Sequence, residues 1–141
     1  MTDIKKVSFL RLLAIMVYDS LGLIAVLMAA TAIVVTANGS QIEPNNPFFS
    51  LFLLLICFLF LGWFWTHGGQ TLGMLAWRVK LTQNDGKTIT WKVAGIRFIT
   101  ALLSWPPAGL GFLWVILDEN NKSWHDHLSK THLQLLPKKG K

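Results

Sequence analysis

Two long apolar runs dominate the pattern of hydrophobic and polar positions along this chain of 141 residues. They cover about residues 9–37 and 48–65, and a short polar loop that carries Glu43 and Pro44 separates them. At about 1.5 Å of rise per residue, the shorter run gives roughly 27 Å of helix, just enough to cross a hydrocarbon layer about 30 Å thick. The pattern therefore predicts two transmembrane helices. The first run is too long for a signal peptide and contains a charge at Asp19, so we expect it to be retained.

The periodicity changes after the second run. Residues 77–90 alternate between apolar and polar positions on both sides of Asn84-Asp85-Gly86, which predicts a β-hairpin around an Asp-Gly turn. Such a hairpin belongs in water or at the membrane interface, because exposed sheet edges are not tolerated in hydrocarbon. Residues 131–136 alternate as well and predict a third strand beside the hairpin.

Residues 91–117 form a third apolar segment, which Pro106-Pro107 divides into two short pieces. Two models are open for this segment: one kinked transmembrane helix, or a re-entrant pair that enters the bilayer and returns. Lys and Arg occur in the N-terminal residues, in the predicted hairpin and in the tail over 118–141, whereas the loop between the two runs has none. The positive-inside rule puts the N-terminus and the hairpin in the cytoplasm, and only the re-entrant model keeps the tail lysines there too.

Composition agrees with a single small membrane domain over residues 1–141. Hydrophobic residues make up 52% of the chain and charged residues 14%, against about 25% charged in ordinary soluble domains. The net charge is +6, and the Lys and Arg residues responsible for it lie mostly beside the apolar segments, where they serve as topology signals. No nucleic-acid-binding signature accompanies them. Cys57 is the single cysteine, so no intramolecular disulfide can form. Because no catalytic triad or phosphate loop is present, we expect neither enzyme activity nor a cofactor.

Asp19 is the most informative charge in the chain. It follows Arg11 by about 12 Å of helix, which places it near the middle of a hydrocarbon layer that begins at Arg11. A carboxylate at that depth costs roughly 2.5–3.5 kcal/mol, so Asp19 is a candidate functional residue, with a packing role as the alternative. Arg11 is too far away to pair with it and is expected to reach the headgroups. We predict that Arg97, in the third apolar segment, is the partner of Asp19; the alternative is that Arg97 also reaches the surface.

Four short segments, taken in order, resemble the RDD family of bacterial membrane proteins. They are Arg11-Leu12-Leu13-Ala14 with Asp19, Gly69-Gln70-Thr71-Leu72-Gly73, Arg97, and Trp124-His125-Asp126-His127-Leu128. The resemblance implies that Arg11, Asp19 and Asp126 are the signature arginine and aspartates, with supporting positions at Arg97, Gln70, Thr71, Trp124 and His125. It also implies a multi-pass protein of the bacterial inner membrane. The chain departs from the family pattern at Met74 and His127, where a basic residue is common.

The histidines near the C-terminus do not form a metal-site pattern. In a helix over residues 124–130, His125 and His127 point in nearly opposite directions, so we expect no metal site. Asp126 is expected to accept hydrogen bonds from the Gly69-Gln70-Thr71 turn or to pair with an arginine.

Two functional hypotheses follow. In the first, the protein exchanges monovalent cations for protons at Asp19, as the resemblance implies for some family members, and forms a homo-oligomer because two helices cannot enclose a pathway. In the second, it is a non-transporting membrane scaffold that binds a partner protein through the hairpin and tail.

Overall fold

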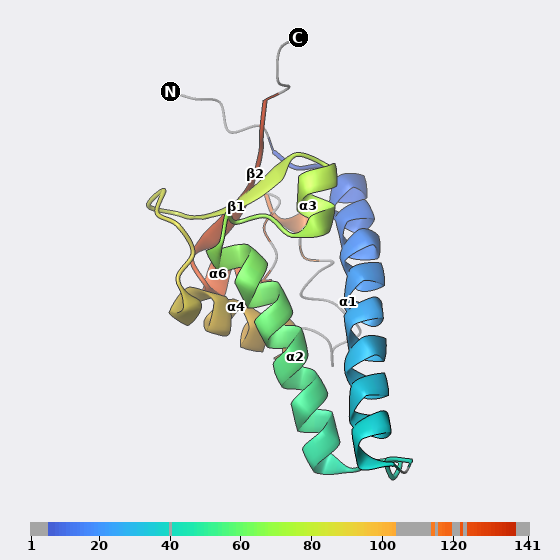
Figure 1. Ribbon diagram of the computed structural model, residues 1–141. Coiled ribbons are helices and arrows are strands. Elements are labelled where there is room, and N and C mark those ends of the chain that lie inside the picture. Colours follow the sequence, from blue (N-terminus) through green and yellow to red (C-terminus); the bar gives the residue numbers. More distant parts are fainter. Residues whose placement is uncertain are drawn as a thin grey trace.

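Two long helices joined by a short loop are the largest elements of the structure (Figure 1). The computed structural model describes residues 6–39, 41–103, 114, 116–119, 122 and 124–137, with the exception of the side chain of residue 125. Helix α1 covers Phe9–Asn38 and helix α2 covers Pro47–Thr66. Both predicted helices are thus confirmed, with bounds that differ by about one residue.

Local sequence explains where these helices meet the loop. Helix α1 ends at Gly39, whose left-handed φ of 64° is accessible to glycine without strain and whose N–H donates to the Val35 carbonyl. Helix α2 begins with Pro47 in its first turn, and the Asn46 side chain accepts hydrogen bonds from the next two backbone N–H groups, of Phe48 and Phe49.

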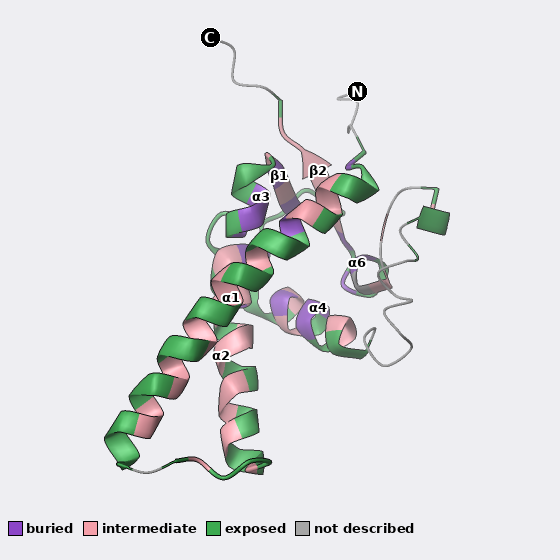
Figure 2. Cartoon of the chain, turned by 90° about the vertical axis from the view of Figure 1, so that its right-hand side faces the viewer, coloured by how far each residue is buried: buried purple, intermediate pink, exposed green. Residues whose placement is uncertain are grey.

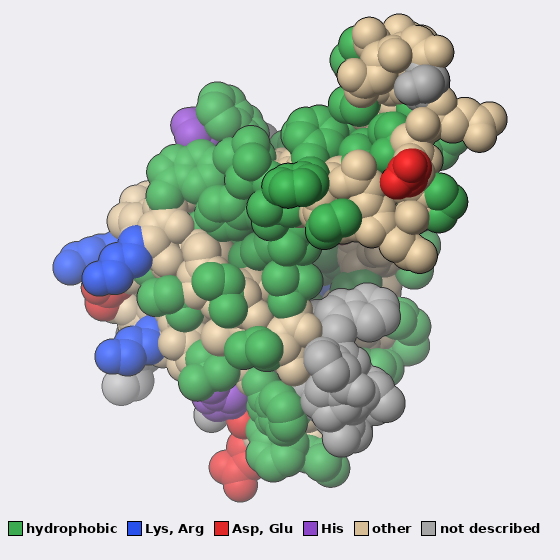
Figure 3. All heavy atoms as spheres, turned by 90° about the horizontal axis from the view of Figure 1, so that it is seen from below, with side chains coloured by type: hydrophobic (Ala, Val, Ile, Leu, Met, Phe, Trp, Pro, Cys, Tyr) green, Lys and Arg blue, Asp and Glu red, His purple; other side chains and the backbone are tan. Residues whose placement is uncertain are grey.

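The long helices keep most of their large apolar side chains on the outside. Figure 2 shows exposed and half-buried residues along most of both helices, and Figure 3 shows hydrophobic side chains over much of the face seen from the loop end. Leu10, Met28 and Phe48, for example, are 76%, 68% and 82% exposed. By length and hydropathy both helices qualify to cross a membrane. An outer surface of this kind suits lipid rather than water.

A two-stranded antiparallel sheet lies at the other end of the long helices from the loop (Figure 1). Strand β1, Val79–Gln83, pairs with strand β2, Thr131–Leu135, so that Val79 faces Leu135 and Gln83 faces Thr131. The strand predicted over 131–136 is therefore present, and its partner lies in the region predicted as a hairpin.

The predicted hairpin over 77–90 is wrong in its second arm. Only β1 is a strand, and residues 87–90 lead directly into helix α4, Trp91–Leu103. The physical reason lies at the second edge of β1: the N–H groups of Leu81 and Gln83 donate there to the carbonyls of Gly69 and Lys87. The backbone at Gly69 therefore takes the place of a second strand on this edge. The bond to Lys87 forms a turn and does not continue as a strand. Gly69 has a φ of 70°, and a Cβ there would lie 2.5 Å from the Leu81 carbonyl oxygen, so only glycine fits.

Two short helices complete the layer around the sheet. Helix α3 covers Leu72–Ala76 and packs against α1, and helix α6 covers Trp124–Leu128 and packs against α4. The apolar core lies where this layer meets α1 and α2 (Figure 2); its most buried members are Val7, Ile15, Trp65, Met74, Val79, Leu81, Ile89, Ala94 and Phe98.

The third apolar segment begins as predicted and then passes out of the described region. Helix α4 lies across the direction of α1 in both ribbon views (Figures 1 and 2). The break at Pro106-Pro107 lies outside the described residues, so the choice between a kinked helix and a re-entrant pair is not tested there. Because β2 is hydrogen-bonded to β1, however, the chain returns after α4 to the end of the molecule that carries the sheet.

Candidate functional site

The Asp19 carboxylate is bound by the start of helix α3. One of its oxygens accepts a hydrogen bond from the Thr71 hydroxyl at 2.6 Å, and the other accepts one from the Gly73 backbone N–H at 2.8 Å. Thr71 is the N-cap of α3, and its hydroxyl also accepts a hydrogen bond from the Met74 N–H. A carboxylate here satisfies donors that the start of a helix leaves without intrahelical partners.

Glycine at position 73 allows this contact to be so close. A Cβ there would lie 2.5 Å from the Ile15 carbonyl oxygen and 3.0 Å from the Asp19 carboxylate. The first distance is too short for a real Cβ and the second is at the lower limit, so a side chain would force α3 away from α1. The run Thr71-Leu72-Gly73 thus supplies one cap, one donor and one point of close approach.

A second polar cluster lies around Arg97, in the middle of α4. Its guanidinium forms an ion pair with Asp126 on α6, and the same nitrogen, Nη1, donates to the Thr131 hydroxyl at 3.0 Å. The Ser129 hydroxyl lies 2.8 Å from that of Thr131. Arg97 and Asp126 are only 3% and 2% exposed, so the ion pair is shielded from solvent. The cluster connects α4, α6 and β2.

Trp65 covers the other side of this cluster. The Arg97 guanidinium carbon lies 5.3 Å from the centre of the Trp65 ring, within the range of a cation–π interaction. Among the described residues, the Nε atoms of Arg97 and Trp65 are buried and have no hydrogen-bond partner. The Trp65 ring therefore covers one face of the Arg97 guanidinium, and Nη1 donates to Asp126 and Thr131.

These contacts correct the predicted pairing of charges. The predicted Asp19–Arg97 pair is wrong, because Asp19 is bound by α3 and Arg97 is paired with Asp126. Of the two alternatives for Asp126, pairing with an arginine is confirmed. The 69–73 turn donates to Asp19 instead.

The other residues that the resemblance singles out lie apart from one another. Arg11 is half-buried on α1 and makes no hydrogen bond or ion pair with any described residue. The Gln70 amide donates to the Val79 carbonyl at 2.8 Å and so attaches the turn before α3 to β1. The Trp124 ring lies 5.9 Å from that of Trp114. His125 lies in α6, and its side chain is outside the described part of the structure.

The other two histidines near the C-terminus make separate hydrogen bonds. His127 lies 3.0 Å from the Asp118 carboxylate, whereas His132 on β2 contacts the Thr82 hydroxyl and the Asn84 side chain. Partial burial, followed by the nearby Lys122 charge, lowers the pKa of His132 from its ordinary value. Over the described residues, no three His, Cys, Asp or Glu side chains are grouped as metal ligands.

Sequence reasoning missed Trp65, Thr131 and Ser129 as parts of the Arg97 cluster. Trp65 lies at the end of the second apolar run, and Thr131 and Ser129 lie at the start of the predicted strand and just before it. All three side chains are recognisable as parts of the site because they lie beside the buried Arg97 charge. That proximity follows from the pairing of β1 with β2 and cannot be read from the sequence.

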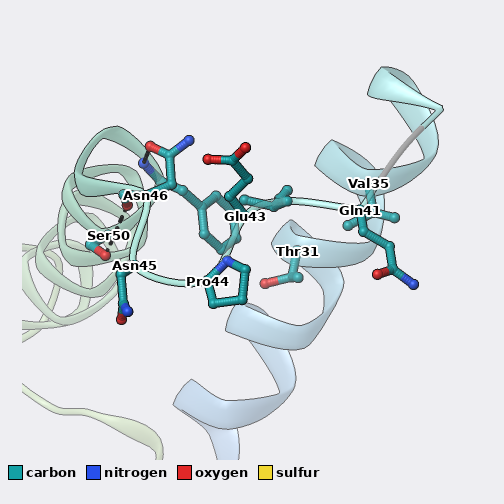
Figure 4. Close-up of a pocket in the computed structure, with 10 residues that line it drawn as sticks. Thr31, Val35, Gln41, Glu43, Pro44, Asn45, Asn46 and Ser50 are labelled. Atoms are coloured by element: carbon teal, nitrogen blue, oxygen red, sulfur yellow. Dashed lines mark hydrogen bonds between the residues drawn. The ribbon is translucent and has the colours of Figure 1, made fainter.

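A pocket of about 440 Å³ lies at the far end of the molecule, between the ends of α1 and α2 and the loop that joins them (Figure 4). Glu43 supplies its only charge, and the Thr31 and Ser50 hydroxyls in its lining already donate to carbonyls of their own helices. This pocket has no contact with either polar cluster.

A profile of the RDD family matches residues 8–130, a range that covers most of the chain and includes Asp19, Arg97 and Asp126. No curated protein and no solved structure matches the sequence. The chain therefore belongs to the RDD family.

Proposed function

We propose that this protein works in the bilayer as an exchanger of protons and a monovalent cation, with Asp19 as the exchanging group. The supporting observation is the carboxylate of Asp19 itself, which is half-buried on a long apolar helix and holds one hydrogen bond on each oxygen. A proton or a small cation bound at these oxygens competes with the two donors of α3. Occupancy of the carboxylate is thereby coupled to the position of α3.

The chain connection extends this coupling to the sheet. Strand β1 begins three residues after α3 ends at Ala76, and the Gln70 side chain before α3 is bonded to the first residue of β1. A shift of α3 upon loading of Asp19 would therefore move β1 as well. This gives the exchange step a conformational consequence in the layer that we assign to the cytoplasm on the basis of its Lys and Arg content.

Helix lengths argue for a shallower site than the sequence-based placement at the bilayer centre. Helix α1 has 30 residues, or about 45 Å, which exceeds the thickness of the hydrocarbon layer. Asp19 precedes the end of α1 at Asn38 by about 28 Å, so a layer that starts at Asn38 would end near Asp19. A site at that boundary, reachable from the cytoplasmic layer, costs less to charge than one at the centre.

A homo-oligomer is part of this proposal. In the part of the chain that the structure describes, two long apolar helices and a short α4 do not enclose a pathway, so the route for the ion would run between subunits. A strictly monomeric protein in nanodiscs would contradict exchange by this route.

The buried Arg97–Asp126 pair favours a second candidate, a membrane scaffold. Its two charges pair with each other inside the fold. They connect α4, α6 and the sheet into a layer at the end of the long helices. Such a layer would present a fixed surface to a partner protein without any ion movement.

Reconstituted vesicles distinguish the two candidates. Wild-type protein should dissipate a pH gradient when sodium, lithium or potassium is added, and Asp19→Asn should abolish this response while the protein still assembles. The matched control is Asp85→Asn, the same chemical change at an exposed loop acid, which should leave exchange intact. Exchange that persists in Asp19→Asn would remove this residue from the mechanism. Well-folded wild-type protein without exchange would favour the scaffold.

A further inference from the structure

Helix α4 is apolar on its exposed face and carries a charged residue, Arg97, on its buried face. Its buried residues include Arg97, and every exposed residue but one is apolar. The exposed apolar side chains are Trp91, Ile96, Ile99, Leu102 and Leu103, with Ile99 and Leu103 59% and 67% exposed. Lys92, in the first turn, is the one exposed charge of the helix. A stripe of this kind is covered by lipid rather than by water.

The contact of α4 with α2 sets its level in the molecule. A Cβ on Gly62 would lie 2.6 Å from the Trp91 ring, so the two helices are in close contact there, and the Phe58 ring packs against both Trp91 and Phe98. Gly62 follows the start of α2 at Pro47 by about 22 Å of a helix about 30 Å long. Helix α4 thus meets α2 in its last third, close to the boundary of a layer that α2 spans. With 13 residues, or about 20 Å, and an orientation across α1, it lies along this boundary.

Three exposed lysines lie on or beside the loop that leads into α4 and in the first turn of α4. The carbonyls of Lys87 and Lys130 accept hydrogen bonds from the adjacent residues Gln83 and Asn84, and Lys92 follows the same loop by a few residues. Figure 3 shows Lys and Arg side chains together at the edge of the lower face where this loop projects. Asp85 is the acid in this loop and pairs with Lys87 at the surface, at 3.3 Å, so a positive charge remains on this edge.

We propose that α4 is an interfacial helix whose apolar face is inserted among acyl chains and whose basic rim, Lys87, Lys92 and Lys130, binds the phosphates of anionic phospholipids. The occupant is the bilayer itself, because the rim borders an apolar stripe and free phosphate would leave that stripe uncovered. Charge complementarity selects anionic over zwitterionic headgroups. The interaction fixes the sheet layer at the membrane surface and does not depend on any ion exchange at Asp19.

The test uses the full-length protein in nanodiscs made of phosphatidylcholine alone or with phosphatidylglycerol, together with lipid titration of the detergent-solubilised protein followed by native mass spectrometry. We expect tighter binding of phosphatidylglycerol to wild type, and a loss of about fivefold per lysine, on the order of 100-fold in total, when Lys87, Lys92 and Lys130 are all replaced by Gln at low ionic strength. The matched control replaces the tail lysines Lys138, Lys139 and Lys141 by Gln, which removes the same charge and should leave most of this preference.

Two outcomes would overturn the proposal. An equal loss in both triple variants would show only general attraction by net charge, and stabilisation of wild type by inorganic phosphate at matched ionic strength would point to a free anion. A spin label at Ile99→Cys in a background without the native cysteine tests the apolar face independently of the lysines. It should be more accessible to oxygen than to a water-soluble nickel chelate, and the reverse result would place α4 in water.

Discussion

The Arg97–Asp126 pair provides the sharpest test of the charge pairing. Replacing Arg97 by Gln leaves the Asp126 carboxylate buried without its counter-charge, and Asp126→Asn leaves the Arg97 guanidinium in the same state. Both side chains are almost fully buried in the folded protein. Each single substitution should therefore lower the free energy of unfolding by about 3–5 kcal/mol. The double variant has no uncompensated charge, and we expect it to lose no more than either single variant does.

This expectation corresponds to a coupling energy of at least about 3 kcal/mol, measurable in a double-mutant cycle by reversible unfolding in mixed detergent micelles. If the single variants fail to fold, recovery of folded yield in the double variant is the readout. The control cycle combines Asp19→Asn with Arg97→Gln, whose side chains belong to different clusters, and its coupling energy should be well below that of the Arg97–Asp126 cycle. Additive losses for Arg97 and Asp126, or a coupling between Asp19 and Arg97 as large as that between Arg97 and Asp126, would refute the pairing described above.

Three further predictions concern backbone approach, pH and topology. Gly73→Ala should lower the free energy of unfolding by about 1–3 kcal/mol, because its Cβ would overlap α1. Gly95→Ala, where a Cβ meets nothing within 4 Å, should be neutral or stabilising, and equal losses in the two variants would contradict the close contact at Gly73. The pKa of His132 is lowered from 6.5, so its contribution to stability is present above 6.5 and is lost as the pH falls below it; His132→Gln should flatten the decline in melting temperature between about pH 7.5 and about pH 5.5, and an unchanged decline would refute this. Because β2 pairs with β1, a cysteine at Lys139 in a background without the native cysteine should resist an impermeant thiol reagent in intact cells, and labelling as efficient as at Asn45→Cys would contradict it.

The long helices were predictable because their signal is a sum over many positions. An apolar run of about twenty residues leaves few alternatives, and single exceptions such as Asp19 do not change the result. The helix bounds also had local signals, since Asn46-Pro47 is a typical helix start and Gly39 a typical end. Strand β2 was predicted from its alternation alone, which is a weaker signal because it rests on few positions.

Pairings were not predictable to the same degree, because they depend on contacts between distant segments. Apolar and polar residues alternate over 87–90 just as they do over 131–135, so the pattern does not distinguish the two segments. Gly69 lies at the second edge of β1, and residues 131–135 pair with the first edge. The partner of Arg97 depends on the same event. Asp126 and Thr131 contact the middle of α4 in a fold in which β2 is paired with β1. Depth along the helix suggested Asp19 as the partner, but depth alone does not determine on which side of the helix a partner lies.

Asp19 and Asp126 stand at the two ends of one connected path of contacts. Asp19 binds α3, which leads into β1; β1 pairs with β2; and β2 carries Thr131, which together with Asp126 binds Arg97. Hydrogen bonds to a charged group are worth about 1.5–3 kcal/mol each, so Asp19→Asn should loosen α3 and, through β1, the sheet. Hydrogen exchange should then accelerate in the 72–76 segment and also in the 131–135 segment, with the Asp85→Asn variant as the control that changes neither. Faster exchange confined to α3 would show that the contact is local, and it would remove the step by which loading of Asp19 is proposed to reach the sheet.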